Sequence, residues 1–171
     1  RREAWKVYER DVYKQSQNLF SEYVDFLSGL AIRDTGLDGR ICQLADQLVG
    51  LMKERDVTHS LTIPARQEAL TSTLARIIRL GFPEWTVWAL PLTAHELGHV
   101  VVNAKLQDFV EQEASTDERA RYHLEEYLAG ASATLIMGPA YAYAAILLRF
   151  NPLLAYFDDK VHPAYAKRAR V

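Results

Sequence analysis

Apolar residues recur at intervals of three and four along most of this chain, which is the spacing of one face of an α-helix. The first such stripe covers residues 2–31 and the second residues 40–55, and the turn-forming sequence RDTGLDG at 33–39 separates them. The first stripe consists of Trp5, Tyr8, Val12, Leu19, Tyr23, Phe26, Leu27 and Leu30. Both segments are therefore expected to be amphipathic helices.

The middle of the chain has a less regular pattern. Residues 57–63 are expected to form a short strand or an extended connector. Pro64 suits the first position of a helix, which is expected to run to Leu80. Gly81 and Pro83 would end that helix. Its inward-facing residues would be Leu70, Leu74, Ile77 and Ile78.

Three helices are expected in the second half of the chain, over residues 93–113, 115–137 and 140–149. Thr93 suits the N-cap of the first, and Ser115 forms a capping-box pattern with Glu118 at the start of the second. The whole pattern predicts one domain, residues 1–171, of the all-α or nearly all-α class. This would be a compact multi-helix domain with at most one or two short strands.

One short motif, the sequence HELGH at residues 95–99, indicates a candidate metal-binding and catalytic function. Residues four apart lie on the same face of a helix, so His95 and His99 could bind one Zn²⁺. Glu96 is rotated by about 100° from His95 and would lie beside the metal, where it could take a proton from water. Gly98 leaves space for a second helix or a substrate. The flanking residues are apolar, and a divalent cation would offset the cost of burying these groups. The alternative is two half-buried histidines with ordinary hydrogen bonds.

A catalytic zinc usually takes three protein ligands, and HELGH supplies two. The metzincin pattern would require Gly at 102 and His at 105, whereas this chain has Val102 and Lys105. An acidic ligand from a later helix is the remaining option, and the segment HLEEYLAG offers Glu125 and Glu126. Glu126 is favoured because it shares its helical face with small and apolar residues that suit close packing. His123 is the least favoured candidate.

HELGH followed on a later helix by such a Glu resembles the gluzincin branch of zinc metallopeptidases. The resemblance covers about residues 90–143. In that branch the third ligand stands in a Glu-x-x-x-Asp pattern, often with Ala before the Asp. Glu126, Ala129 and Gly130 match the Glu, Ala and Asp positions, so Gly130 replaces the Asp that normally orients a zinc-binding His. The resemblance implies a zinc-dependent hydrolase of peptide bonds, with endopeptidase activity favoured over exopeptidase activity.

Two later residues are candidates for the donor that stabilises the oxyanion of peptide hydrolysis. Tyr141 directly follows a Gly-Pro-Ala helix entry and is favoured over Tyr143. His162 is a candidate if the C-terminal segment folds over the cleft. A place in the core is the alternative for each tyrosine. The basic run at 167–170 is expected to be a solvated chain end.

The composition of the chain limits which binding partners and which cellular compartment are expected. A net charge of −2 gives no general attraction to nucleic acid or to an anionic membrane. The single cysteine, Cys42, permits no internal disulfide and favours a reducing compartment, so a cytoplasmic location is expected. Residues 127–148 are uncharged and long enough to cross a bilayer. They are rich in small residues, however, and Gly138 and Pro139 interrupt them, so two core helices are expected there.

The expected partner is a peptide or protein substrate. The chain begins with Arg rather than Met and shows no signal-peptide pattern, which favours a processed chain or an excised domain. Fusion to or association with regulatory domains is therefore also expected. The replacement at Gly130 favours one alternative, a catalytically inactive metallopeptidase-like domain that acts as a binding or regulatory module.

Overall fold

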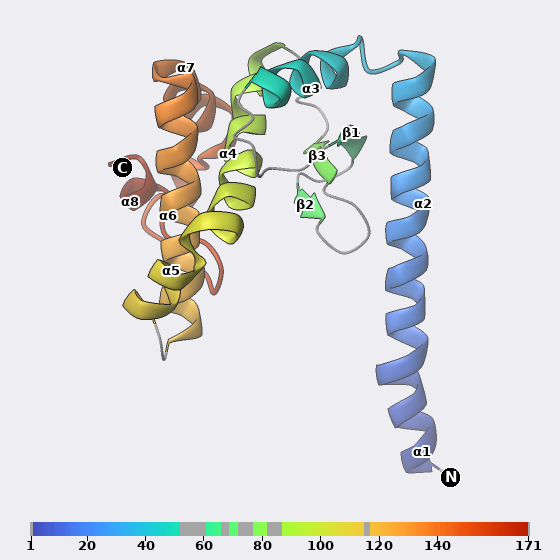
Figure 1. Ribbon diagram of the computed structural model, residues 1–171. Coiled ribbons are helices and arrows are strands. Elements are labelled where there is room, and N and C mark those ends of the chain that lie inside the picture. Colours follow the sequence, from blue (N-terminus) through green and yellow to red (C-terminus); the bar gives the residue numbers. More distant parts are fainter. Residues whose placement is uncertain are drawn as a thin grey trace.

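The computed structural model describes residues 2–51, 61–65, 69–71, 77–81, 87–114 and 117–170. Helices make up most of these residues, and a small sheet lies between a long N-terminal helix and the helices of the second half (Figure 1). The expected class, all-helical or nearly so, is confirmed. None of the described helices has the length and apolar character needed to cross a membrane.

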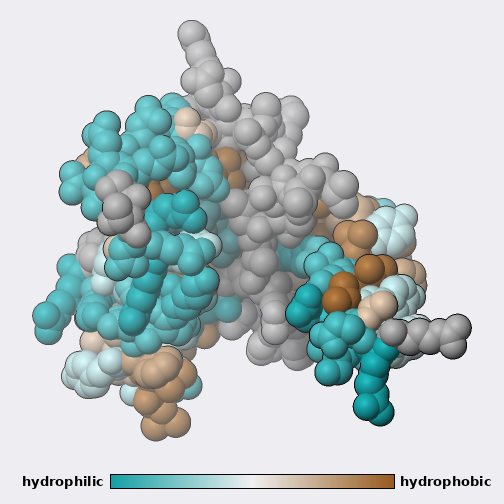
Figure 2. Space-filling model, turned by 90° about the horizontal axis from the view of Figure 1, so that it is seen from below, coloured by the Kyte–Doolittle hydropathy of each residue, from teal (hydrophilic) through white to brown (hydrophobic). Residues whose placement is uncertain are grey.

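The N-terminal helix is long and largely exposed. It comprises α1 (Arg2–Val7), a π-helical stretch (Tyr8–Tyr13) and α2 (Lys14–Thr35), and Gly36 ends it with a positive φ of 73°. The predicted helix is therefore present, but most of the apolar stripe that defined it lies at the surface. The N-terminal half of this helix projects beyond the sheet in Figure 1, and Figure 2 shows apolar residues at the surface of that end.

Polar contacts attach α2 to the rest of the molecule. The Arg33 side chain donates a hydrogen bond to the carbonyl oxygen of Thr62 at 2.6 Å and forms an ion pair with Asp46. Asp46 in turn accepts a hydrogen bond from the backbone N–H of Thr62 at 2.8 Å. Asp46 lies on α3 (Ile41–Leu51), and Asp38 caps that helix by accepting the N–H of Cys42. The second half of α2, α3 and the first strand are thereby held together.

The sheet contains β1 (Leu61–Ala65), β2 (Ala69–Thr71) and β3 (Ile77–Gly81) in the order β1-β3-β2. Strands β1 and β3 are parallel, whereas β2 is antiparallel to β3. The predicted helix over residues 64–80 is therefore wrong. The run from Ile77 to Leu80 begins with two β-branched residues, and a short apolar run cannot be assigned to helix or strand by spacing alone. The expected strand at 57–63 overlaps β1, and its residues 57–60 lie outside the described residues.

The central element of the fold is α4 (Leu90–Val101), which follows a 3₁₀ turn (Val87–Ala89). One face of α4 contributes Leu97 and Val100 to a cluster with Val49 of α3 and Ile78 of β3. A second face contributes Leu92 and Ala94 to a cluster with the later helices. A π-helical stretch (Val102–Leu106) and α5 (Gln107–Glu113) continue from α4. The expected helix over 93–113 is therefore present, though it begins earlier and is not regular throughout.

The next helix, α6 (Glu118–Met137), packs along α4. Asp117 caps it by accepting the N–H groups of Arg119 and Ala120. The expected cap Ser115 lies outside the described residues. Gly138 then adopts φ 58° and ψ −142°, a conformation that is essentially restricted to glycine, and turns the chain sharply.

After this turn the chain returns along the earlier helices. It forms α7 (Pro139–Ala144), a π-helical stretch (Ala145–Arg149), a 3₁₀ turn (Pro152–Leu154) and α8 (Tyr165–Arg168). The uncharged segment 127–148 is thus two helices broken at Gly138, as expected. A hydrogen bond of 3.0 Å joins His123 Nε2 to the carbonyl oxygen of Asp159, so the C-terminal segment contacts α6.

Candidate metal centre

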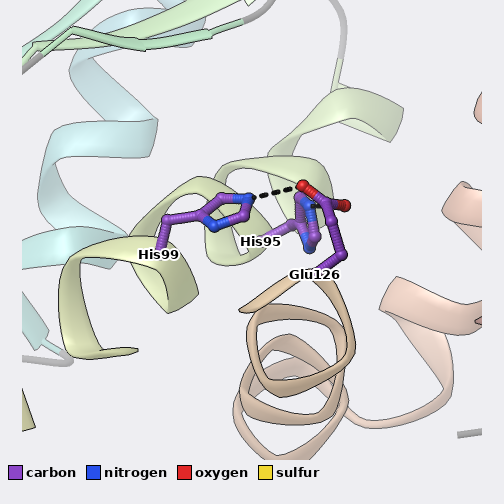
Figure 3. A group of neighbouring side chains, drawn as sticks. All are labelled: His95, His99 and Glu126. Carbon is purple, nitrogen blue, oxygen red and sulfur yellow. Dashed lines mark ion pairs between the residues drawn. The ribbon is translucent and has the colours of Figure 1, made fainter. Parts of the chain in front are cut away.

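Three side chains from two helices converge at the point where α4 and α6 meet. Figure 3 shows His95 and His99 projecting from α4 toward Glu126 on α6. His99 Nε2 lies 3.2 Å from Glu126 Oε1, and His95 Nε2 lies 3.5 Å from Glu126 Oε2. One potential ligand atom from each residue lies within 4.8 Å of the others. Of the two acidic candidates weighed from the sequence, Glu126 is the one placed at the histidines.

Gly98 allows this convergence because it removes a side chain from the contact between the helices. A Cβ atom at Gly98 would lie 2.6 Å from the carbonyl oxygen and 2.8 Å from the Cα of Ala129. Both atoms belong to the backbone, so they cannot move aside like the end of a flexible side chain. Any side chain at position 98 would therefore push α6 away and carry Glu126 with it. The expectation that Gly98 leaves space for a second helix agrees with this contact.

Glu126 lies among four potentially cationic side chains while it is only 6% exposed. Besides the two histidines of α4, His162 Nε2 lies 3.9 Å from Oε1 and Arg168 Nη2 lies 3.1 Å from Oε2. Oε2 nevertheless accepts no well-aligned hydrogen bond from the described residues. A buried carboxylate oxygen without such a partner is suited to binding a cation.

Opposite effects act on the pKa values of these groups. Burial alone would raise the pKa of Glu126, but its contacts with His95 and His99 and the charge of Arg168 lower it well below its usual range. Burial alone would lower the pKa of His99, whereas its contact with Glu126 raises it. Glu126 is therefore ionised at neutral pH and available as a ligand.

Glu96 lies on α4 next to His95 and is buried, with 7% of its surface exposed. Burial raises its pKa, and the charges of His95 and His99 oppose that shift. A buried carboxyl group with a raised pKa, close to two histidines, is suited to accepting and returning a proton. Glu96 thus lies beside His95 on α4, as the helical spacing predicted, and its role as a general base stays a prediction.

The two tyrosines weighed from the sequence have different surroundings. Tyr143 is 67% exposed, whereas Tyr141 is buried and its hydroxyl lies 3.2 Å from His95 Nδ1. Burial raises the pKa of the Tyr141 phenol, against the effect of Arg168. The Tyr141 hydroxyl thus contacts the imidazole nitrogen opposite the one that faces Glu126.

The C-terminal segment does return over the site, which was the condition for a role of His162. His162 is half-exposed, and Asp159 holds it through hydrogen bonds to its backbone N–H and to Nδ1. The candidate His123 lies elsewhere, against the backbone of Asp159.

Sequence reasoning missed Arg168. The run 167–170 was expected to be solvated, but the Arg168 side chain is only 13% exposed and also lies 3.4 Å from His95 Nε2. The sequence offered one indirect signal, the placement of His162 shortly before this run, because a segment that brings His162 to the site also brings its neighbours.

A cavity of about 210 Å³ adjoins the cluster. Its walls combine apolar residues from the second half of the chain with Glu126, Thr134, Tyr141 and two arginines. The apolar part of the wall includes Ala142, Ala145, Ile146, Phe150 and Ala169. Glu126 therefore lies at a hollow that a small group could enter.

The residues present fit a zinc ion. Ligands held 2.0–2.1 Å from a tetrahedral Zn²⁺ are about 3.4 Å apart, which is close to the two separations between Glu126 and the histidines. Two imidazoles and one carboxylate are also a common ligand set of catalytic zinc, with a fourth position left for water. Comparison of the chain with protein-family models, with curated proteins and with solved structures finds no significant match.

Proposed function

We propose that this chain is a zinc-dependent peptidase in which His95, His99 and Glu126 hold the metal. The observation that carries the proposal is the convergence of three ligand atoms from α4 and α6 at a buried carboxylate. The resemblance of HELGH and the later Glu to gluzincins supports zinc as the ion and the peptide bond as the substrate. The cavity of about 210 Å³ beside the cluster would admit part of a peptide or protein substrate.

When bound, a zinc ion would polarise the scissile carbonyl group and lower the pKa of water. The chain itself must then move a proton. Glu96 would accept the proton of the attacking water and pass it to the nitrogen of the leaving amine. Its burial beside His95 and His99 supports this role, because a raised pKa makes the second transfer easier.

Negative charge develops on the carbonyl oxygen during peptide hydrolysis, and a donor beside the metal stabilises it. His162 and Arg168 are suited to this task because both lie on the carboxylate side of the cluster. For Tyr141 the same role is less well supported, because its hydroxyl has its hydrogen bond with His95 Nδ1. We therefore assign the oxyanion to His162 and Arg168.

Glu96→Gln tests the proposal together with His95→Ala and metal analysis of the full chain. The parent is expected to carry one zinc per chain, and His95→Ala to lose it. Glu96→Gln should keep the zinc and cleave a mixture of fluorogenic peptides at least about 100-fold more slowly, because it removes the general base. Glu125→Gln is the matched control, since it makes the same chemical change on α6 at a residue outside the cluster.

Two results would contradict the proposal. A parent chain without zinc after reconstitution would contradict the metal site. A Glu96→Gln variant that cleaves as fast as the parent would contradict the assignment of Glu96 as the general base.

An inactive binding or regulatory module is the second candidate function. The contact of Arg168 with Glu126 and His95 favours it, because a guanidinium can take the place of a metal as the partner of the carboxylate. That module would bind no zinc and cleave none of the peptides.

A further inference from the structure

The hydrogen bond between Tyr141 and His95 fixes one end of an imidazole whose other end belongs to the cluster. The Tyr141 hydroxyl lies 3.2 Å from Nδ1, whereas Nε2 faces Glu126 at 3.5 Å. The two rings are also nearly parallel, with 11° between their planes and 6.0 Å between their centroids. A histidine that binds a metal through Nε2 must carry its proton on Nδ1, and it needs an acceptor for that proton.

Gly130 leaves open the space that the Tyr141 hydroxyl uses. A Cβ atom at Gly130 would meet a single neighbour within 4 Å among the described residues, the Tyr141 hydroxyl oxygen at 3.7 Å. A longer side chain at position 130 would therefore extend toward the hydroxyl and compete with it for His95. Gly130 is also the position at which the gluzincin pattern has its Asp. The acceptor for His95 thus comes from a different helix in this chain.

Gly138 and Pro139 explain how Tyr141, which follows soon after the end of α6, reaches His95 on α4. The positive φ of Gly138 reverses the chain, and Pro139 occupies the first turn of α7. Tyr141 then packs in a cluster with Leu92 and Ala94 of α4, immediately before His95. Its ring is held by this apolar packing, so the hydroxyl has little freedom to leave Nδ1.

We propose that Tyr141 is the positioning residue of His95, accepting the Nδ1 proton in the space left by Gly130 and thereby directing Nε2 toward the metal position. This inference rests on the proposed metal site. It assigns Tyr141 a role in metal binding rather than in the reaction, because its hydroxyl lies at Nδ1, whereas Nε2 is the nitrogen next to Glu126. A neutral hydroxyl replaces a carboxylate in this arrangement.

Zinc affinity of the full chain, measured by competition with a chelator, tests the inference. Tyr141→Phe is expected to weaken zinc binding about 10- to 100-fold, the usual effect of removing a hydrogen-bond partner of a ligand. Tyr143→Phe removes the same hydroxyl from the exposed side of α7 and should bind zinc as the parent does. The double variant Gly130→Asp with Tyr141→Phe should recover part of the lost affinity, because it returns a carboxylate to the same space.

The ¹⁵N shifts of His95 in the zinc-loaded chain give a second measurement. In the parent, Nε2 should show the shift of a metal-bound nitrogen, and Tyr141→Phe should change the shift of Nδ1, because the hydrogen bond at that nitrogen is lost. A merely structural tyrosine would not change the Nδ1 shift in a variant that remains folded by circular dichroism. Zinc bound by the parent, with an unchanged affinity or an unchanged Nδ1 shift in a folded Tyr141→Phe variant, would overturn the inference alone. If the parent bound no zinc, the proposed function would fail and the inference with it.

Discussion

At the level of single residues, Glu126 is the carboxylate that the other charged side chains of the site surround. Its two oxygens are divided among His99 and His162 on one side and His95 and Arg168 on the other. A buried carboxylate is costly unless positive charge surrounds it, and this arrangement supplies that charge from α4, α8 and the loop that carries His162. The same charge lowers the pKa of Glu126, which keeps it ionised.

The contact between Gly98 and Ala129 gives a prediction at the same scale. Gly98→Ala should destabilise the fold by about 1–3 kcal/mol, because the new Cβ meets backbone atoms that must move. It should also weaken zinc binding, since α6 carries Glu126 away from the histidines. Urea unfolding and chelator competition measure the two effects.

Gly50→Ala is the control for that variant. A Cβ at Gly50 would meet no atom within 4 Å among the described residues, and Gly50 also lies in a helix. The substitution should be neutral or stabilise the fold by up to about 1 kcal/mol, since alanine is the better helix former. Equal destabilisation by both substitutions would contradict the account of Gly98.

At the level of elements, α4 and α6 carry the three residues of the candidate metal site, and α3 and β3 pack against α4. Helix α4 has apolar side chains on two faces, one toward α3 and β3 and one toward α6 and α7. This explains why the residues around HELGH are apolar on both sides. The polar groups of the motif are left at the line where α4 meets α6.

The start of α6 gives a prediction at this scale. Asp117→Ala removes the side chain that accepts the N–H groups of Arg119 and Ala120, so the fold should lose about 1 kcal/mol in urea unfolding. Asp117→Asn should retain most of the stability, because asparagine caps a helix almost as well. Zinc affinity should change little in either variant, because Glu126 lies two turns further along the helix. A large loss of zinc affinity in Asp117→Ala would show that the cap also controls the site.

At the level of the whole molecule, the site is completed by the return of the chain after Gly138. Tyr141, His162 and Arg168 all reach the cluster from this C-terminal part. Asp158 helps to hold the return, since it accepts the N–H of Ala164 at 2.7 Å and pairs with Lys167. A site built from α4 and α6 alone would lack these three side chains.

Arg168 gives a prediction at this scale, because it contacts two proposed ligands at once. Arg168→Gln should bind zinc about tenfold more tightly or better, since it removes a positive charge that competes for Glu126 and repels the ion. Peptide cleavage should nevertheless fall, because the variant also loses a donor for the oxyanion. Chelator competition and peptide cleavage are measured on the same preparation.

Arg170→Gln is the matched control for zinc affinity. It removes the same charge from an exposed residue in the wall of the same cavity, two positions later, so zinc affinity should remain within about twofold of the parent value. Weaker zinc binding by Arg168→Gln would show that the guanidinium holds Glu126 in place for the metal instead of competing with it.

The sequence by itself determined the features that depend on local spacing. The positions of His95, Glu96 and His99 on one helix follow from the helical repeat, and the break at Gly138 follows from backbone sterics. The same local rules failed at residues 64–80, because a strand in a small sheet is decided by its neighbours. They also predicted a stripe on the first helix without revealing that most of it lies at the surface.

Tertiary structure decided the features that depend on residues far apart in the chain. It placed Glu126 rather than Glu125 at the histidines, put the Tyr141 hydroxyl at His95 Nδ1, and brought Arg168 from the end of the chain to the same carboxylate. Helical spacing gives the direction of a side chain on its own helix, but it gives neither the distance to another helix nor the path by which the chain returns. Those follow from the close contact at Gly98 and the turn at Gly138, which only the packed molecule contains.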